Sequence, residues 1–487
     1  MTDSPAVEAV DEGQSVYEEE PAHEDQAHED QAYEEPTREE GSVYDLVGVG
    51  IGPFNLSLAA LCDRAPELRT LFLDAKPAFS WHPGLLMEGT VLQVPFLADL
   101  VTMADPTSPW SYLNYLHAHD RMFPFFFSER FHIPRREYDH YCRWVADGLA
   151  SCRFDARVTQ LDWDDEAGAF AVTYRSAKGG TTRLLARQIV LGVGTLPVVP
   201  APLRPLLTPA HEGRILHSAD YRTHRAELAA ADDVTVIGAG QSGAEVALDL
   251  LRHQDGDGAG GPYVRWLART PAFAPMEYSK LGLEHFTPDY IRYFRTLPAP
   301  RRDELVREQW QLYKGVSEET LAEIHDELYE RTIGGTEPRA ALHPGLEVVG
   351  VAPEKGQGPD GAGGYVLTCR HTEQDTVMEI RTSAIVSATG YAAARPDFLD
   401  GDGPAKLIDW DDRGRYRIDG TYRVALDPRV RGALYVQNAE LHTHGVSAPD
   451  LTLGAWRAAT ILNAVAARTV LRVPERAAWT TFGARRS

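Results

Sequence analysis

The sequence predicts an α/β fold in which parallel strands alternate with helices. Residues 44–49 form a short apolar run that enters a glycine-rich turn and then an apolar helical pattern over 55–61. Residues 234–237 enter a second glycine-rich turn, followed by a helical pattern that extends to 251. Strand–turn–helix units repeated in this way are typical of parallel sheets with crossover helices. We therefore predict two Rossmann-like, doubly wound nucleotide-binding domains with a small helical substrate-binding region.

The length and charge of the chain indicate an acidic protein with more than one domain. Its 487 residues are about three times the ~150 that serve as a prior for one domain. The net charge of −23 argues against a nucleic-acid partner, because phosphate binding needs clustered Lys and Arg. Residues 1–41 hold 15 acidic residues and one basic residue, and this composition predicts a disordered acidic tail. His23 and His28 of its short repeat could hold a metal, but a solvated tail is the better interpretation, and we predict no metal site.

The sequence shows no sign of a membrane or secretory protein. No run approaches the ~18 apolar residues of a membrane span, and residues 1–41 lack an apolar signal-peptide core. The four cysteines are scattered and form neither a CxxC pattern nor a disulfide framework. We expect a cytoplasmic protein, because a reducing compartment keeps such thiols free.

The order of these patterns predicts the domain boundaries. We assign one nucleotide-binding domain to residues 42–200 plus 380–487, and the second to 201–379. An Arg- and Glu-rich stretch with helical periodicity at about 270–345 predicts a helical substrate-binding region within the second domain.

The first glycine turn has the spacing of a phosphate-binding turn, with Gly48, Gly50 and then Pro53 in the third position. The first glycine permits the turn, and the second lets the backbone approach a pyrophosphate at the helix N-terminus. Proline is tolerated in the first turn of a helix because its missing N–H has no partner there. Asp74 ends the next predicted strand, near the position where an acid accepts hydrogen bonds from an adenosine ribose. A purely structural turn is the alternative interpretation.

The second glycine turn repeats this arrangement at Gly238, Gly240 and Gly243. No acid stands at the end of a following strand. Instead, Arg269 follows the apolar run 264–268. An arginine at this position suits a 2′-phosphate and favours NADPH over NADH, although a solvent-facing arginine is the alternative.

Two nucleotide-binding domains in one chain suggest a flavoprotein that takes hydride from a nicotinamide. Disulfide reductases need a redox-active cysteine pair, and no two of the four cysteines are close in sequence. Oxygen chemistry is therefore the better interpretation.

Several blocks of the sequence resemble the siderophore-associated N-hydroxylating flavin monooxygenases, a family of lysine N6-, ornithine N5- and diamine N-monooxygenases. The resemblance runs from about residue 43 to 470. The blocks that carry it are 48–56, 79–84, 92–102, 108–115, 134–138, 240–243, 388–391 and 443–445.

The resemblance implies a flavin that NADPH reduces and that reacts with O2 to give a C4a-hydroperoxyflavin, whose distal oxygen passes to a neutral primary amine. The FAD-binding residues that it implies are Asp74, Lys76, Trp81, His82, Gln93, Val158, Pro449, Asp450 and Leu451. Those for NADPH are Gly240, Gln241, Ser242 and Arg269. No catalytic side chain is implied, because the protein positions the reactants, excludes water and favours the neutral amine.

One departure from the family pattern bears on the substrate. Members that act on lysine or ornithine resemble one another at Phe-Leu-Lys-Asp-Leu-Val, whose lysine holds the substrate carboxylate. Here Ala98 takes the place of that lysine, and Leu283 and Tyr313 align with asparagines that hold the amino-acid end. Burying a carboxylate without a charged partner lowers affinity by about 10²-fold, whereas a diamine has no carboxylate. We therefore predict N-hydroxylation of cadaverine or putrescine for hydroxamate siderophore biosynthesis.

The substrate-binding residues are then Ala98, Leu283, Tyr313, Thr452 and Glu284, and either of the last two could meet the far ammonium. Three alternatives stay open. An L-lysine N6- or L-ornithine N5-monooxygenase would need Lys280 or Lys314 to reach the carboxylate. A carbon-oxygenating flavin monooxygenase is not expected to carry the blocks 81–84 and 92–93 together, and a catalytically inactive flavin-binding subunit is disfavoured by two intact glycine turns. The partners that we expect are a small diamine and O2, and the resemblance alone implies a homo-oligomer.

Overall fold

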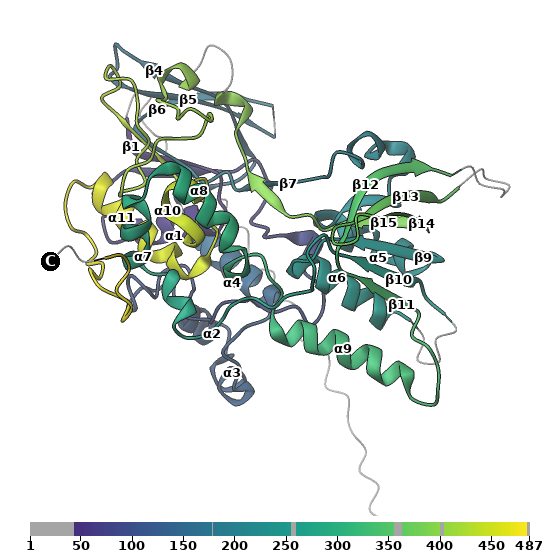
Figure 1. The fold of residues 1–487 in the computed structure, drawn as a ribbon. Coiled ribbons are helices and arrows are strands. Elements are labelled where there is room, and N and C mark those ends of the chain that lie inside the picture. Colours follow the sequence, from purple (N-terminus) through teal and green to yellow (C-terminus); the bar gives the residue numbers. More distant parts are fainter. Residues whose placement is uncertain (1–42, 178, 255–259, 355–362, 400–403, 485–487) are drawn as a thin grey trace, which may run out of the picture. The chain divides into compact units, whose positions relative to one another are not determined.

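The structure is a computed structural model that describes residues 43–177, 179–254, 260–354, 363–399 and 404–484 (Figure 1). The predicted acidic tail lies outside these residues. The structure contains two separate sheets with parallel strands, as the sequence patterns predicted.

Five parallel strands form the centre of the first sheet, in the order β3-β2-β1-β6-β17. β1 (Tyr44–Val49) pairs with β2 (Thr70–Leu73) on one side and with β6 (Thr181–Leu191) on the other. β3 (Cys152–Arg153) and β17 (Ala433–Val436) pair with β2 and β6 respectively. The central strand is almost wholly buried, which explains its unbroken apolar sequence.

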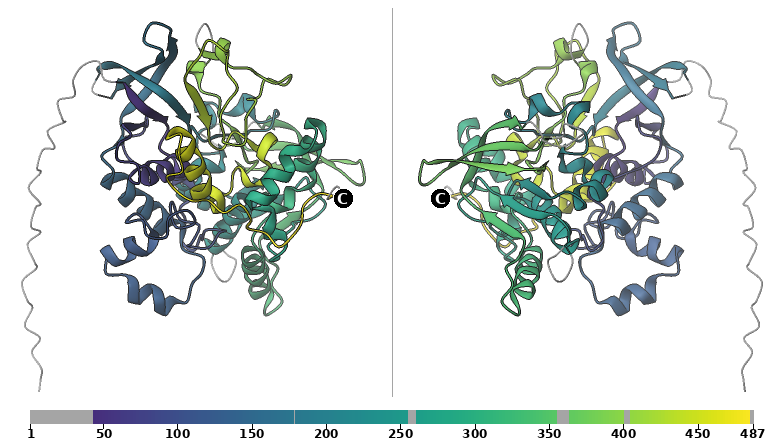
Figure 2. Two further views of the ribbon diagram at one scale, coloured as in Figure 1. Left: turned by 90° about the vertical axis from the view of Figure 1, so that its left-hand side faces the viewer. Right: turned by 90° about the vertical axis from the view of Figure 1, so that its right-hand side faces the viewer.

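β6 is long enough to take part in both the parallel sheet and an antiparallel meander. Its last residues pair in parallel with β1, whereas its first half continues an antiparallel meander with β5 (Ala169–Ser176) and β4 (Ala156–Asp164). Figure 2 shows this meander at the upper edge of both views.

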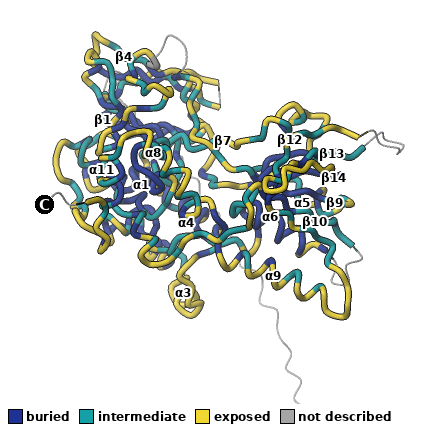
Figure 3. The backbone as a smooth tube through the Cα atoms, viewed as in Figure 1, coloured by how far each residue is buried: buried dark blue, intermediate teal, exposed yellow. Residues whose placement is uncertain are grey.

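Helices cover one face of the first sheet. α1 (Pro53–Cys62) packs against α4 (Arg135–Gly148) and α11 (Gly454–Val465), and their apolar side chains share one core with β1, β2 and β6. α2 (Tyr112–Ala118) and α3 (Met122–Ser128) add aromatic rings to this core. Buried residues therefore follow the strands and inner helices, as the dark blue parts of Figure 3 show.

The second sheet has the parallel order β11-β10-β9-β15-β8. Its strands are β11 (Ala340–His343), β10 (Tyr263–Leu267), β9 (Asp233–Ile237), β15 (Ala384–Ser387) and β8 (Ile215–His217). β15 pairs with β9, although we predicted that the chain rejoins the first domain at residue 380. An apolar pattern identifies a buried strand but does not indicate which sheet it joins.

A three-stranded antiparallel sheet packs on the second parallel sheet. It consists of β12 (Leu346–Pro353), β13 (Tyr365–His371) and β14 (Val377–Thr382). Two short strands, β7 (Thr195–Pro197) and β16 (Tyr391–Ala393), pair with each other where the chain passes between the two parallel sheets.

Helices also form in the predicted helical region at 270–345, but they pack on different partners. α7 (Pro288–Thr296) and α8 (Ala299–Glu308) contact α10 (Leu441–His444), which belongs to the C-terminal part of the chain. α9 (Glu318–Thr332) instead packs against α6 (Gln241–Arg252) of the second sheet.

The other helix on the second sheet is α5 (Tyr221–Ala229), which contacts α6.

Among the described residues, none of the helices combines the length and the hydropathy that a membrane crossing requires.

Candidate active site

The first glycine turn leaves the N-terminus of α1 open. Gly50 has φ +88°, a left-handed conformation, and a Cβ there would overlap the carbonyl oxygen of Gly192. Gly52 precedes α1 without a side-chain cap, and a Cβ there would meet nothing within 4 Å. Pro53 is the first helical residue, as predicted. An uncapped helix N-terminus that faces open space is suited to a pyrophosphate.

Two residues that the sequence analysis did not single out hold this turn in place. The Asn55 side-chain amide donates to the carbonyl oxygen of Gly50 at 2.8 Å, and its Oδ1 accepts from Gln437 at 2.7 Å. Gln437 follows β17, almost 400 residues later in the chain, so no local pattern could have indicated the contact. Gly48 lies in β1, and a Cβ there would overlap the ring of Phe72.

Asp74 ends β2 beside the turn, where the sequence analysis expected an acid. Its two carboxylate oxygens accept backbone N–H bonds from Ile51 at 2.7 Å and from Lys76 at 2.8 Å. The Lys76 ammonium donates to the carbonyl oxygen of Ser80 at 2.9 Å. Since an ionised carboxylate can accept about four hydrogen bonds, Asp74 can hold the turn and still accept from a ribose.

Trp81 and His82 lie next to the space between the two sheets. The Trp81 backbone N–H donates to Asp139 at 2.8 Å, and its ring contacts Tyr138 and His82 edge-on, each with centroids 5.1 Å apart. His82 has φ 46°, and its ring centroid lies 5.6 Å from that of Tyr391.

Neighbouring residues surround His82, although part of its side chain is exposed. Burial lowers its pKa to about 4, and the charges of Arg135 and Lys76 act in the same direction.

Two buried amide atoms at this site have no hydrogen-bond partner among the described residues. They are Nε2 of Gln93, a predicted FAD contact, and Oε1 of Gln437. A buried amide group normally has a partner, so these atoms point to a polar group that the chain itself does not supply. Together with the open α1 N-terminus, they fit a dinucleotide with a pyrophosphate and a polar ring.

The other predicted FAD contacts lie on separate elements near the turn. Val158 is on β4, whose first residue, Ala156, donates its backbone N–H to the carbonyl oxygen of Asp74 at 2.8 Å. Asp450 is held at the entrance to α11 by the Thr452 backbone N–H at 2.7 Å, and Pro449 and Leu451 flank it. Burial raises the pKa of Asp450.

The second glycine turn is also open at a helix N-terminus. Gly238 has φ +134°, and a Cβ there would overlap the carbonyl oxygen of Ala388. Gly240 precedes α6 without a side-chain cap, and Gly243 lies against the backbone of Gly238. Ser242 lies in the first turn of α6. This geometry repeats the phosphate-binding arrangement of the first turn.

Gln241 has a structural role that the sequence analysis did not predict. Its Oε1 accepts the Ser317 backbone N–H at 2.7 Å, and its Nε2 donates to Glu245 at 2.9 Å and to Thr320 at 3.0 Å. Its side chain therefore joins α6 to the start of α9, and its backbone N–H stays at the open helix N-terminus.

Two cations stand beside the second turn. Arg269 follows β10, its side chain is 76% exposed, and its ion pair with Glu347 is long, at 3.9 Å. Burial and, to a smaller extent, the charge of Arg269 lower the pKa of Lys314, whose carbonyl oxygen adjoins Gly240. The sequence analysis considered Lys314 only as a partner for a substrate carboxylate. Its position beside Arg269 fits a contact with an anionic nucleotide instead.

Ala98, at the position of the family's lysine, is 5% exposed. The next residue, Asp99, fixes the loop by accepting backbone N–H bonds from Val101, Thr102 and Tyr112 at 2.6–2.9 Å. Ala98 is therefore a buried apolar residue in a loop that these hydrogen bonds fix.

The other predicted substrate contacts are held by different parts of the chain. The Tyr313 hydroxyl donates to the carbonyl oxygen of Val306 at 3.1 Å. Leu283 is 39% exposed. Glu284, proposed to meet an ammonium, accepts the backbone N–H groups of Trp479 at 3.0 Å and Thr480 at 2.7 Å. These bonds tie down the C-terminal segment, and the contact of Glu284 with an ammonium stays a prediction.

A buried ion pair joins the helices of the two sheets. Arg135, the first residue of α4, lies 2.8 Å from Glu245 of α6. Burial raises the pKa of Glu245, and the charge of Arg135 opposes that rise. The charge of Arg135 also contributes to the lowered pKa of His82, after burial.

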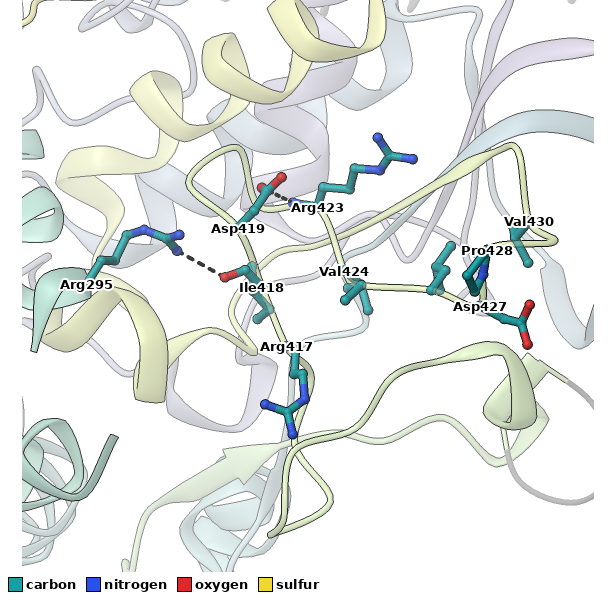
Figure 4. Close-up of a pocket in the computed structure, with 11 residues that line it drawn as sticks. Arg295, Arg417, Ile418, Asp419, Arg423, Val424, Asp427, Pro428 and Val430 are labelled. Carbon is teal, nitrogen blue, oxygen red and sulfur yellow. Dashed lines mark hydrogen bonds between the residues drawn. The ribbon is translucent and has the colours of Figure 1, made fainter. Parts of the chain in front are cut away.

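The structure also has a cavity of about 650 Å³ on another side, and none of its lining residues is a predicted site residue (Figure 4). Its arginines include Arg295, which donates to the carbonyl oxygen of Ile418 at 3.1 Å, and Arg417, which pairs with Asp409 at 3.3 Å. Within the described residues, no three His, Cys, Asp or Glu side chains gather as metal ligands would.

Comparisons with known proteins agree with this geometry. A profile described as "L-lysine 6-monooxygenase/L-ornithine 5-monooxygenase" matches residues 42–393. The chain is 44% identical to the rhizobactin siderophore biosynthesis protein RhbE of Rhizobium meliloti, over 90% of this chain and 95% of that protein. It is 41% identical to a putrescine N-hydroxylase of Shewanella oneidensis, over 91% of this chain and 84% of that protein.

A solved structure extends the likeness to three dimensions. The FAD-bound cadaverine monooxygenase DfoA of Erwinia amylovora, from a desferrioxamine biosynthetic pathway, is 37% identical and superposes with a TM-score of 0.85. The match covers 92% of this chain and all of that one. With two open glycine turns in the expected fold, the protein belongs to the L-lysine 6-monooxygenase/L-ornithine 5-monooxygenase family of flavin-dependent N-monooxygenases.

Proposed function

We propose that this protein is an FAD- and NADPH-dependent N-hydroxylase of an aliphatic diamine, putrescine or cadaverine, in hydroxamate siderophore biosynthesis. The observation that carries the choice of substrate is the buried Ala98 where relatives acting on amino acids place a lysine. The putrescine N-hydroxylase and the cadaverine monooxygenase named above support the same class of substrate.

FAD would be held at the first glycine turn, with its pyrophosphate at the N-terminus of α1 and its ribose at Asp74. Nε2 of Gln93 and Oε1 of Gln437, which have no partner among the described residues, offer a donor and an acceptor to the rest of the cofactor. NADPH would be held at the second turn, where α6 begins and where Arg269 and Lys314 supply positive charge. When bound, the reduced flavin supplies the activation of O2 that the side chains of the protein cannot provide.

The residues of the chain then position the amine and exclude water. An alkyl ammonium has a pKa of about 10.4 in water, and its nitrogen has a free lone pair only after deprotonation. Desolvation at the reacting end of the substrate favours the neutral amine by withholding solvent from the charged form.

The apolar side chain of Ala98 disfavours amino-acid substrates. A lysine or ornithine carboxylate placed at Ala98 would lose its hydration without gaining a cation, which lowers affinity by roughly 10²-fold. Lys314, one of the two alternative cations considered, adjoins Gly240 of the second turn and feels the charge of Arg269, which supports its use for the nucleotide.

The experiment is a measurement of hydroxylamine product from the FAD-loaded enzyme with NADPH and O2, using putrescine, cadaverine, L-lysine and L-ornithine separately. We expect product from the diamines and little from the amino acids. NADPH consumption without hydroxylamine from any amine would overturn the proposal, because an uncoupled flavin forms only hydrogen peroxide.

We also infer that the protein self-associates and works in a reducing compartment such as the cytoplasm. The family resemblance supports self-association. The four cysteines are free, and three of them are buried, which supports the compartment because oxidising surroundings favour disulfides.

A further inference from the structure

α3 exposes a face of phenylalanine rings to solvent. Phe123, Phe126 and Phe127 are 74%, 72% and 73% exposed. Residues three and four positions apart in a helix lie on one face. The ring centroids of Phe126 and Phe127 are 5.5 Å apart, and those of Phe123 and Phe127 are 6.3 Å apart. We call these three residues, with Met122, the phenylalanine face.

The exposure is not a sign of a loosely attached helix. On the opposite side of α3, the ring of Phe125 packs edge-on against Phe96 at 5.3 Å and Tyr112 at 5.6 Å, within the core of the first sheet. Before the helix, Arg121 forms an ion pair with Glu137 of α4 at 2.7 Å. α3 is therefore attached to the core through Phe125, while its other residues are exposed and drawn yellow in Figure 3.

The exposed area is at the upper end of what single-chain proteins expose as one apolar patch. At about 150–250 Å² per aromatic side chain, three rings exposed by roughly three quarters give on the order of 450 Å². Phe131, 53% exposed and in contact with Phe96, and Met122, 39% exposed, bring the total to roughly 600 Å². A typical protein interface buries about 800 Å² on each partner. This patch is therefore most of one side of an interface.

We propose that the phenylalanine face binds the same face of a second copy of this chain. A two-fold axis requires a self-complementary surface, and a face without charged side chains meets itself without repulsion. At the end of α3, exposed Glu129 and Arg130 offer opposite charges that can pair across such an axis. The chain carries a net charge of −23, so an anionic membrane repels it, which favours a protein partner over a lipid surface.

This inference identifies the surface for the self-association proposed above, and it does not depend on the proposed reaction. The test is the molar mass of the full-length protein by size-exclusion chromatography with light scattering, over a dilution series. One chain is 53.8 kDa. We expect a mass of at least two chains for the wild type, and Phe126→Glu should raise the dissociation constant of the dimer at least about 30-fold.

Trp479→Glu is the matched control, because Trp479 is 88% exposed and lies far from α3 in the sequence. It should leave the mass unchanged. If Phe126→Glu fails to fold, Phe123→Cys provides a second test, since two copies meeting at this face should form an intermolecular disulfide under oxidation.

Three results would overturn the proposal. They are a wild type that is monomeric at about 10 µM, a Phe126→Glu variant that keeps the wild-type mass, and a Phe123→Cys variant that does not cross-link. Sedimentation with phosphatidylcholine–phosphatidylglycerol vesicles that Phe126→Glu abolishes would assign the face to a lipid surface instead.

Discussion

The ion pair between Arg135 and Glu245 allows a quantitative prediction about stability. The two charges are 2.8 Å apart, and their side chains are only 11% and 4% exposed. Arg135→Met removes the cation and leaves Gln241 as a neutral partner of the buried carboxylate. Breaking a buried pair from one side costs about 3–5 kcal/mol. With a slope of about 3 kcal/mol per molar urea, the urea midpoint should fall by roughly 1 M or more at pH 8.

The pH dependence has a definite sign. Burial raises the pKa of Glu245, and removing Arg135 removes the charge that opposes this rise. When the pKa of an acid is higher in the folded than in the unfolded state, its contribution to stability is present at low pH and is lost as the pH rises through the folded-state pKa. The deficit of Arg135→Met should therefore be smaller at pH 5.5 than at pH 8. Adding Glu245→Gln should recover more than half of it at pH 8.

The assay is urea unfolding followed by tryptophan fluorescence at both pH values. Arg143→Met is the matched control, because Arg143 pairs with Asp139 at 3.0 Å but is 47% exposed, so its loss should cost under about 1 kcal/mol. A loss under about 1 kcal/mol for Arg135→Met at pH 8, or a deficit that grows as the pH falls, would refute the reasoning.

Three further variants test individual residues. Lys314→Gln should raise the KM for NADPH about five- to tenfold, because it removes a charge beside the second turn. Lys280→Gln is the control, and equal KM values for the two variants would contradict this role of Lys314. Ala98→Lys should lower kcat/KM for putrescine at least about tenfold by placing one ammonium near another, whereas Leu97→Lys, at an exposed neighbour, should not. Glu284→Gln should lower the melting temperature and leave the KM for the diamine within about twofold. A large rise in that KM at an unchanged melting temperature would place Glu284 at the substrate site.

Local patterns account for most of the fold that could be predicted. The glycines at 50 and 238 have positive φ before a helix, so their spacing predicted a glycine turn at both places. β15 is different, because its pairing with β9 joins strands almost 150 residues apart and depends on the packing of the whole sheet.

In the candidate site, too, only residues whose positions follow from local spacing could be predicted. Asp74 stands where its strand ends, which spacing can indicate. Glu284 binds the backbone of residues 479–480, and Lys314 stands beside Arg269, because the tertiary fold brings these segments together. Pairings of this kind leave no periodic trace in the sequence.

The central claim is the choice of a diamine over an amino acid, and a competition experiment tests it most directly. The FAD-loaded enzyme would receive equimolar putrescine and L-lysine in one tube with NADPH and O2, and both hydroxylamine products would be quantified by mass spectrometry. Their ratio reports the ratio of the two kcat/KM values. The account predicts that N-hydroxyputrescine exceeds N6-hydroxylysine by about 10²-fold, whereas comparable amounts or an excess of N6-hydroxylysine would contradict the role given to Ala98.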